Sequence, residues 1–139
     1  MRKVCFIHYF GTQHAPGIFS EIVDALFDSG LFQALDRLHL SLHGDPRFGP
    51  SVRELSRLSG KLVVLSTYDN APGIGESATL MQIRDYALRS SAMEAICYLH
   101  TKGATNNSDV QQAWRQYMLD FVAYCWRNAE HKLASYHLW

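Results

Sequence analysis

Apolar residues along this chain follow two periodicities that alternate from one end to the other. Four short runs rich in β-branched and aromatic residues are typical of strands, and they cover residues 4–9, 37–42, 62–67 and 95–99. Apolar residues recur at helical spacing over residues 18–29, 51–58, 77–89 and 108–132. A strand followed by a helix, repeated along the chain, predicts right-handed crossovers and an α/β fold. We therefore expect a three-layer, Rossmann-like domain in which helices cover a mainly parallel sheet of about four strands.

The second strand and the last helix carry the most specific structural expectations. In the second strand, leucines alternate with His39 and Ser41, which is typical of a strand with one polar face and suggests an edge position. The last helix begins at Ser108, where Ser108 and Gln111 fit a capping box, and we expect it to continue unbroken to about Lys132. Its apolar series is expected to pack into the core: Val110, Ala113, Trp114, Tyr117, Met118, Phe121, Val122 and Cys125.

Composition narrows the class of protein without identifying it. The length of 139 residues fits a single domain over 1–139. Thirteen basic residues balance thirteen acidic ones, so no overall charge attracts nucleic acid or an anionic membrane. No apolar run approaches the ~18 residues of a membrane span, and the short N-terminal run does not fit a signal peptide. The cysteines, Cys5, Cys97 and Cys125, lie in apolar segments, which predicts buried, reduced thiols in a soluble, cytoplasmic protein.

A polar tetrapeptide, His100-Thr101-Lys102-Gly103, directly follows the last strand. Ligands of parallel α/β sheets bind at the carboxyl ends of the strands, so this is where such a fold places its site. Lys102 can hold a phosphate as a point charge, Thr101 and His100 can donate hydrogen bonds, and Gly103 lets the backbone approach a ligand closely. A polar tetrapeptide is also what ends many strands, so position alone leaves a ligand-binding and a structural role open.

Two residues from other segments join this candidate site. His8 ends the first strand, whose following loop contacts the nucleotide in nucleotide-binding α/β folds, although a histidine in a strand is more often buried and hydrogen-bonded. Glu76 opens the third helix, where a carboxylate can bind hydroxyl groups or simply interact favourably with the helix dipole. The chain has no GxGxxG fingerprint, no Walker loop, no zinc-ligand spacing and no nucleophile elbow. The sequence therefore assigns no catalytic residue and no metal ligand.

The residues around the tetrapeptide resemble a family of bacterial glycosyltransferases found among polysaccharide-synthesis proteins. In that family a strand ends in a His-Thr-Lys-Gly motif, and the next helix carries a Trp-Arg-x-Tyr-Met pattern followed by a Phe and a Trp. Beyond residues 100–103, the matching residues in this chain are Trp114, Arg115, Tyr117, Met118, Phe121 and Trp126. Upstream matches are the helix end at residues 28–31 and the set Glu76, Thr79 and Leu80. The resemblance extends from near the N-terminus to about Leu133.

The resemblance implies a nucleotide-sugar-binding domain that transfers a sugar from a nucleoside diphosphate donor. Lys102 and His100 would bind the diphosphate, Glu76 would bind hydroxyl groups, and Arg115 would brace the 100–103 loop through its guanidinium. Trp114 is expected to lie in the core. The cofactor is left open: the family suggests Mg²⁺ or Mn²⁺ with the nucleotide sugar, but the Asp-x-Asp pair that commonly holds such an ion is missing.

The alternative is a non-catalytic binding or assembly module derived from such an enzyme. Family members continue past the last helix into an acceptor-binding half, whereas this chain ends near the point where the next strand would begin. We therefore expect a truncated, donor-side domain, and the sequence leaves open whether it is an enzyme. Tyr136, Leu138 and Trp139 form an apolar tail that a four-stranded core does not need. From this tail and the open sheet edge we predict a homodimer or higher oligomer.

Overall fold

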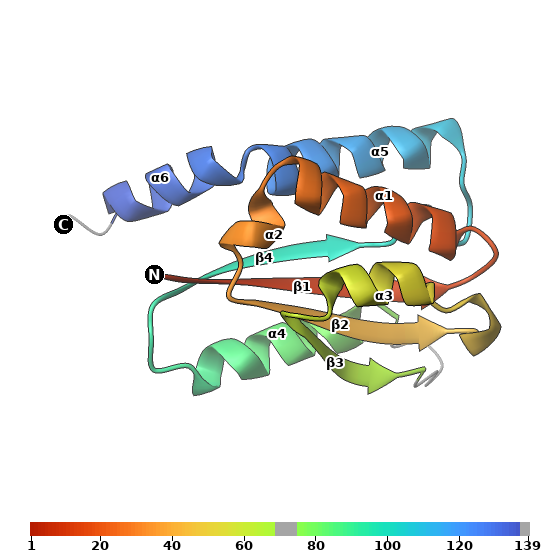
Figure 1. The fold of residues 1–139 in the computed structure, drawn as a ribbon, viewed down its shortest axis with the longest axis horizontal. Helices are drawn as coiled ribbons and strands as arrows, with labels where there is room; N and C mark the ends of the chain where they lie inside the picture. Colours follow the sequence, from red (N-terminus) through yellow and green to blue (C-terminus); the bar gives the residue numbers. More distant parts are fainter. Residues whose placement is uncertain (69–74, 137–139) are drawn as a thin grey trace.

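The computed structural model describes residues 1–68 and 75–136 of the chain. Strands and helices alternate along it (Figure 1). The strands are β1 (Arg2–Gly11), β2 (Arg37–Gly44), β3 (Leu62–Thr67) and β4 (Glu94–His100). The helices are α1 (Ala15–Asp28), α2 (Leu31–Ala34), α3 (Val52–Leu58), α4 (Ser77–Arg89), α5 (Asp109–Leu119) and α6 (Trp126–Tyr136). The predicted strands and the helices between them are confirmed, and most of the loop predicted over 68–75 lies outside the described residues.

The strands form one all-parallel sheet in the order β3-β2-β1-β4, which confirms the expected Rossmann-like α/β fold. β1 lies inside the sheet and pairs with β2 on one side and β4 on the other. The chain proceeds outward from β1 to β3 and then crosses back to place β4 beside β1 (Figure 1). The strand order therefore reverses between β1 and β4, and in open α/β sheets ligands bind at such a reversal, outside the carboxyl ends of the strands.

The prediction that the second strand lies at an edge is wrong. β2 lies between β1 and β3, and its polar residues His39 and Ser41 are buried. The His39 ring stacks on Phe6 at a centroid distance of 4.6 Å and lies 5.2 Å from the ring of Tyr86 on α4. The side of β2 that carries His39 and Ser41 is therefore polar in composition but covered by a helix. This is possible because the flat face of a histidine ring can pack against other rings.

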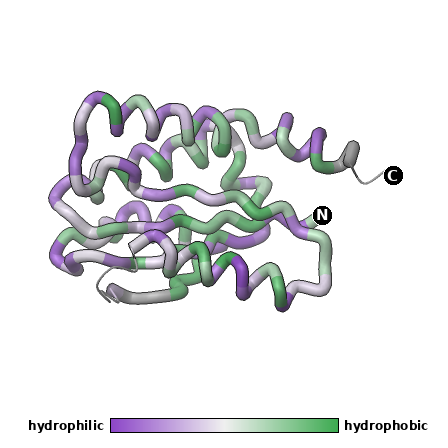
Figure 2. Tube along the Cα trace, turned by 180° about the vertical axis from the view of Figure 1, so that it is seen from behind, coloured by the Kyte–Doolittle hydropathy of each residue, from purple (hydrophilic) through white to green (hydrophobic). Residues whose placement is uncertain are grey.

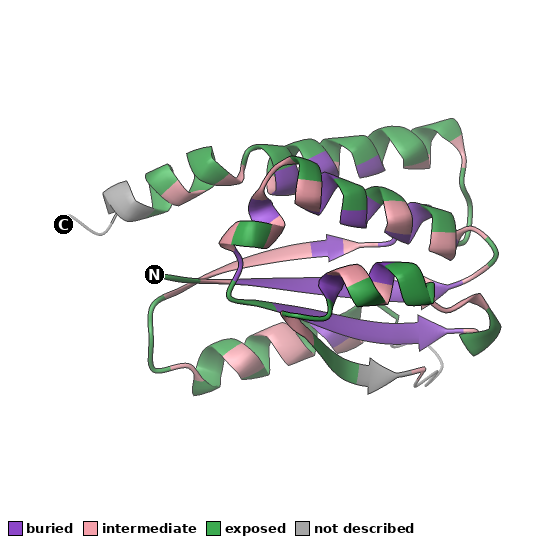
Figure 3. Cartoon of the chain, in the orientation of Figure 1, coloured by how far each residue is buried: buried purple, intermediate pink, exposed green. Residues whose placement is uncertain are grey.

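Alternate residues of β1 face two different helical layers. Cys5, Ile7 and Tyr9 belong to the main core, which they share with α1 and with Leu58 of α3. Phe6 and His8 face α4 instead. Hydrophobic residues lie along the central strands (Figure 2), and burial is greatest in β1, β2 and the inner side of α1 (Figure 3). The sheet is thus covered by helices on both faces, as expected.

The last helix is interrupted, and only part of its predicted core face packs inward. A π-helical turn (Asp120–Tyr124) interrupts it, and α6 extends past the amino ends of the strands (Figure 1). Met118 and Val122 of the predicted core face pack against the core, and Arg115, Leu119 and Ala123 beside them are buried. Trp114, Tyr117 and Phe121 of the same predicted face are more than half exposed. The outer side of α5 is accordingly open to solvent (Figure 3). Trp114 is therefore not a core residue.

The cysteines and the C-terminal tail also test the sequence-based expectations. All three thiols are free, but only Cys5 is fully buried; Cys97 is partly buried and Cys125 is exposed, contrary to expectation. In the predicted apolar tail, Leu138 and Trp139 lie outside the described residues, and for Tyr136 only the backbone is described. None of the helices in the described ranges is long and apolar enough to cross a membrane.

Candidate functional site

Polar side chains from three remote segments meet where β1 and β4 end side by side. His8 of β1 is in register with His100 of β4, and Glu76, just before α4, lies within bonding distance of His100. A cavity of about 350 Å³ opens here, a volume typical of small-molecule sites. Its lining includes most of the site residues expected from the sequence, namely His8, Glu76, His100, Thr101, Lys102 and Gly103. The reversal in strand order brings them together.

Glu76 holds the His100 ring in a defined orientation. His100 Nδ1 lies 2.7 Å from Glu76 Oε1, and because a carboxylate only accepts, Nδ1 donates. Tyr98, on the same face of β4, donates its hydroxyl to the same oxygen at 2.6 Å. Burial works to raise the pKa of Glu76, but the hydrogen bonds from Tyr98 and His100 outweigh it and lower the pKa overall. With the hydrogen on Nδ1, the lone pair of an uncharged His100 ring is on Nε2, where it can accept a proton from a bound molecule.

His8 contributes a neutral, immobilised ring to the cavity. It is 5% exposed, its Nδ1 lies 2.8 Å from Thr79 Oγ1, and its ring stacks on His43 at 4.8 Å. Burial and the charge of His43 lower the pKa of His8 to about 4, so the ring is uncharged at neutral pH. The interpretation of His8 as a buried, hydrogen-bonded histidine is confirmed, and the same ring lines the cavity.

The 100–103 turn is fixed to β1 through Thr101. Its amide donates to the carbonyl of His8 at 3.0 Å, and its hydroxyl oxygen accepts from the amide of Phe10 at 3.0 Å. Gly103 adopts φ +91°, and a Cβ there would lie 3.0 Å from Arg115 Nη1 and 3.3 Å from Gln111 Cβ. Any other residue at position 103 would have a strained backbone at this φ, and its Cβ would be crowded by Arg115 and Gln111. Thr101 thus anchors the turn, while Gly103 lets it bend.

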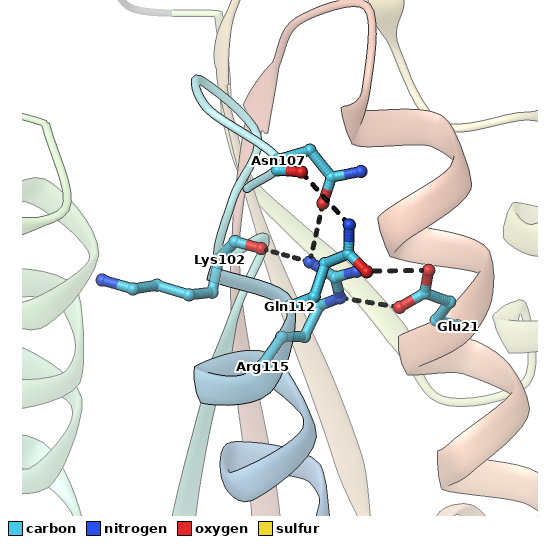
Figure 4. Close-up of polar contacts among 5 residues, drawn as sticks. All are labelled: Glu21, Lys102, Asn107, Gln112 and Arg115. Carbon is cyan, nitrogen blue, oxygen red and sulfur yellow. Dashed lines mark hydrogen bonds and ion pairs between the residues drawn. The ribbon is translucent and has the colours of Figure 1, made fainter. Parts of the chain in front are cut away.

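Arg115 fixes the same turn from α5 (Figure 4). Its Nη1 donates to the carbonyl of Lys102 at 2.9 Å and to Asn107 Oδ1 at 3.3 Å, while its Nε donates to Glu21 Oε2 at 2.6 Å. The Arg115 side chain is 6% exposed, whereas that of Glu21 is 52% exposed. The guanidinium therefore joins α1, α5 and the turn, and the expectation that Arg115 braces this loop is confirmed.

Lys102 brings a positive charge to the cavity. Its side chain points away from the Arg115 network (Figure 4), and its ammonium lies 4.9 Å from the centre of the Trp114 ring. This cation–π contact orients the ammonium without neutralising its charge. A phosphate-bearing ligand in the cavity would therefore meet a cation whose position is already restricted.

The described part of the cavity is a poor match for a chelated divalent cation. Glu76 is its only carboxylate among the described residues, and Oε1 already accepts two hydrogen bonds. Elsewhere in the described ranges, no group of three or more His, Cys, Asp and Glu side chains could hold a metal. Mg²⁺ and Mn²⁺ favour several oxygen ligands.

A second cavity of about 500 Å³ lies at the opposite end of the sheet, lined by Arg2, Arg37 and Arg89 among others. Gln82 Oε1 and Glu94 Oε2, also on its lining residues, are buried without a hydrogen-bond partner among the described residues. This cavity lies at the amino ends of the strands, where α/β sheets do not usually bind ligands. The smaller cavity is the better candidate because strand-end polar groups converge there.

The side chains that position the site were not identified from the sequence. Tyr98 holds Glu76, Thr79 contacts His8, and Glu21 pairs with Arg115. The two-residue spacing between Tyr98 and His100 places both on one face of a strand, so Tyr98 could have been found. Glu21 carried no signal, because a single acidic residue on a helix is most simply a solvated one.

A family model described as a domain of unknown function (DUF8361) matches residues 36–131. This segment covers more than half of the chain and includes Glu76 and the 100–103 turn, but not His8. No curated protein and no solved structure is significantly similar to the chain. The site geometry therefore carries the functional interpretation.

Proposed function

The chain belongs to the DUF8361 family, and we propose that it binds a nucleoside diphosphate sugar in the cavity where β1 and β4 end. The observation that carries this proposal is the convergence of His8, Glu76, His100 and Lys102 on one cavity at the reversal in strand order. Lys102 binds the diphosphate by charge, and Glu76 Oε2 accepts from sugar hydroxyl groups. This assignment agrees with the resemblance of the His-Thr-Lys-Gly turn to glycosyltransferases of polysaccharide synthesis.

The orientation of His100 supports sugar transfer as the reaction. An acceptor hydroxyl group loses its proton to His100 Nε2 while its oxygen bonds to the anomeric carbon of the sugar. The bond between that carbon and the diphosphate oxygen breaks, and the nucleoside diphosphate leaves as an anion beside Lys102. Glu76 stabilises the imidazolium that forms, because its carboxylate accepts from Nδ1 at 2.7 Å.

The first test is thermal unfolding with UDP, GDP, CMP and dTDP nucleotides and their sugars, with and without Mg²⁺ or Mn²⁺. A ligand at 100 times its dissociation constant adds about 2.7 kcal/mol to the free energy of unfolding, which gives a clear shift in Tm. Lys102→Ala should abolish the shift, while Arg53→Ala, which removes an exposed charge from α3, should leave it intact. Absence of a shift with every nucleotide would refute the proposal.

The second candidate is a non-catalytic binding or assembly module, and the exposed aromatic side of α5 favours it. Release of nucleoside diphosphate from a bound nucleotide sugar distinguishes the two candidates. An enzyme loses this release in His100→Gln while retaining ligand binding. A binding module shows no release in either form of the protein.

A further inference from the structure

A continuous stripe of large apolar side chains runs along the solvent side of α5 and through the π-helical turn. Its members are Val110, Trp114, Tyr117, Phe121 and Tyr124, which are 59%, 56%, 68%, 76% and 47% exposed. We call this surface the aromatic stripe. Single exposed apolar residues are common, but a set of neighbouring large apolar side chains that are all exposed to solvent marks an interaction site.

The spacing of the aromatic stripe indicates what kind of surface covers it. Its members follow one another at intervals of four, three, four and three residues. Along α5 this spacing places the side chains on one face of the helix, a face that a second helix can cover, and Phe121 and Tyr124 extend it into the π-helical turn. Between residues 110 and 124, Asp120 is the only exposed charged residue, because Arg115 is buried. Near Trp114 the stripe also meets one cation, the Lys102 ammonium, which lies 4.9 Å from the centre of that ring. The stripe therefore fits a mainly apolar helical surface better than a nucleic acid or an anionic lipid surface.

A second copy of the chain supplies such a surface. In an antiparallel pair related by a twofold axis near Tyr117, Val110 meets Tyr124 of the other copy and Trp114 meets its Phe121. At 150–250 Å² per aromatic side chain, the exposed fractions leave roughly 500 Å² of aromatic surface per copy, so pairing buries about 1,000 Å² in total. That area fits a weak, concentration-dependent dimer, since stable specific interfaces begin at about 1,200 Å² in total.

The apolar surface also continues beyond the stripe. Phe121 lines a groove of about 260 Å³ beside β4, together with Val122, Trp126 and Leu133. A partner helix lying on the stripe would therefore meet further apolar surface at its end, which adds to the buried area. The groove lies on the same side of the molecule as α5 and α6.

We infer that the aromatic stripe is a dimerisation surface, at which two copies of this chain pair through α5. The inference rests on the exposed stripe alone and does not depend on the ligand proposed for the cavity. In this dimer the oligomer predicted from the sequence pairs through α5, and not through the C-terminal tail.

Sedimentation velocity over a wide range of protein concentrations tests the inference. The wild-type protein should move from monomer to dimer as concentration rises. Tyr117→Glu and Phe121→Glu should each weaken dimerisation at least about 100-fold, because each places a charge at the centre of an apolar interface. Leu88→Glu is the matched control: Leu88 is 72% exposed but lies on α4, on the opposite face of the sheet, so the dimer should persist.

A cross-linking experiment avoids any effect of the glutamates on folding. In a Cys125→Ser background, which removes the exposed native thiol, Tyr117→Cys should form a disulfide-linked dimer on mild oxidation, whereas Leu88→Cys should not. A protein that stays monomeric at every concentration would overturn the inference. So would a dimer that survives both glutamate substitutions and fails to cross-link through position 117.

Discussion

Replacing Arg115 with methionine tests how the 100–103 turn is held. The substitution keeps a long side chain but removes the buried guanidinium and its contacts with Lys102, Asn107 and Glu21. The bonds to Lys102 and Asn107 count most, because a charged donor contributes about 1.5 kcal/mol or more to each. The Glu21 pair counts as a surface interaction worth at most about 1 kcal/mol, since the carboxylate side chain is 52% exposed. We expect the free energy of unfolding to fall by about 2–4 kcal/mol.

Urea denaturation at a fixed protein concentration measures this loss, and hydrogen exchange of the amides in residues 101–107 reports on the turn itself. Arg84→Met is the control, because Arg84 is exposed on α4, and its substitution should change stability by no more than about 0.5 kcal/mol. Arg115→Lys should recover only part of the loss, because an ammonium lacks the planar fork that reaches both Glu21 and Lys102. A loss below about 1 kcal/mol in Arg115→Met, with unchanged exchange in the turn, would refute this account.

Three further outcomes follow from buried side chains and free thiols. Because the pKa of His8 is lowered to about 4 in the folded state, only the unfolded chain takes up this proton as the pH falls from about 6.5. The free energy of unfolding should therefore fall by about 3 kcal/mol between pH 6.5 and 4, and His8→Asn should flatten that pH profile; an equally steep profile in the variant would contradict it. His39→Phe should raise the free energy of unfolding by about 1 kcal/mol, measured as a higher urea midpoint, because both buried ring nitrogens lack a partner among the described residues. A loss of stability would show that these nitrogens form hydrogen bonds. In thiol labelling, Cys125 should react in the folded protein and Cys5 only on unfolding, and rapid labelling of Cys5 would contradict the described core.

The order of strands and helices was predictable because each apolar run carries a clear period of its own. The position of β2 was not, since its alternation of leucine with His39 and Ser41 is the same for an edge strand and for an inner strand covered by a helix. The pairing of β2 with both β1 and β3 makes it an inner strand, and Tyr86 of α4 covers His39 on its polar side. The stacking of His39 on Phe6, which joins residues on two strands, is a contact that no local pattern reveals.

The face that α5 turns inward was also hidden from the sequence. Apolar spacing favoured Trp114, Tyr117 and Phe121 as the buried side, yet Arg115 is buried in their place. The reason is that Arg115 satisfies the carbonyl of Lys102, as expected from the sequence, and pairs with Glu21, which lies 94 residues away in the sequence. A pattern of hydrophobic residues does not show that a buried arginine fixes a helix face, nor that the opposite face is left for another molecule.

The candidate site was predicted better than the helix beside it. His100 and Lys102 were placed correctly, because polar residues after a parallel strand must lie at one edge of the sheet. Glu76 was chosen from a family resemblance, and its pairing with His100 was not foreseen, because a loop and a helix separate the two. His8 reached the site through the register between β1 and β4, which the sequence alone does not specify.

The location of the ligand is tested most directly by titrating the isotope-labelled protein with UDP and recording the backbone amide resonances. UDP is the probe, and GDP, CMP and dTDP follow if it does not bind. The account predicts that the largest shifts occur at residues 100–105, at 8–12 and at Glu76, and that Lys102→Ala removes them. Shifts centred instead on Arg2, Arg37 and Arg89 at the opposite cavity, or no shift with any of the nucleotides, would contradict the proposed site.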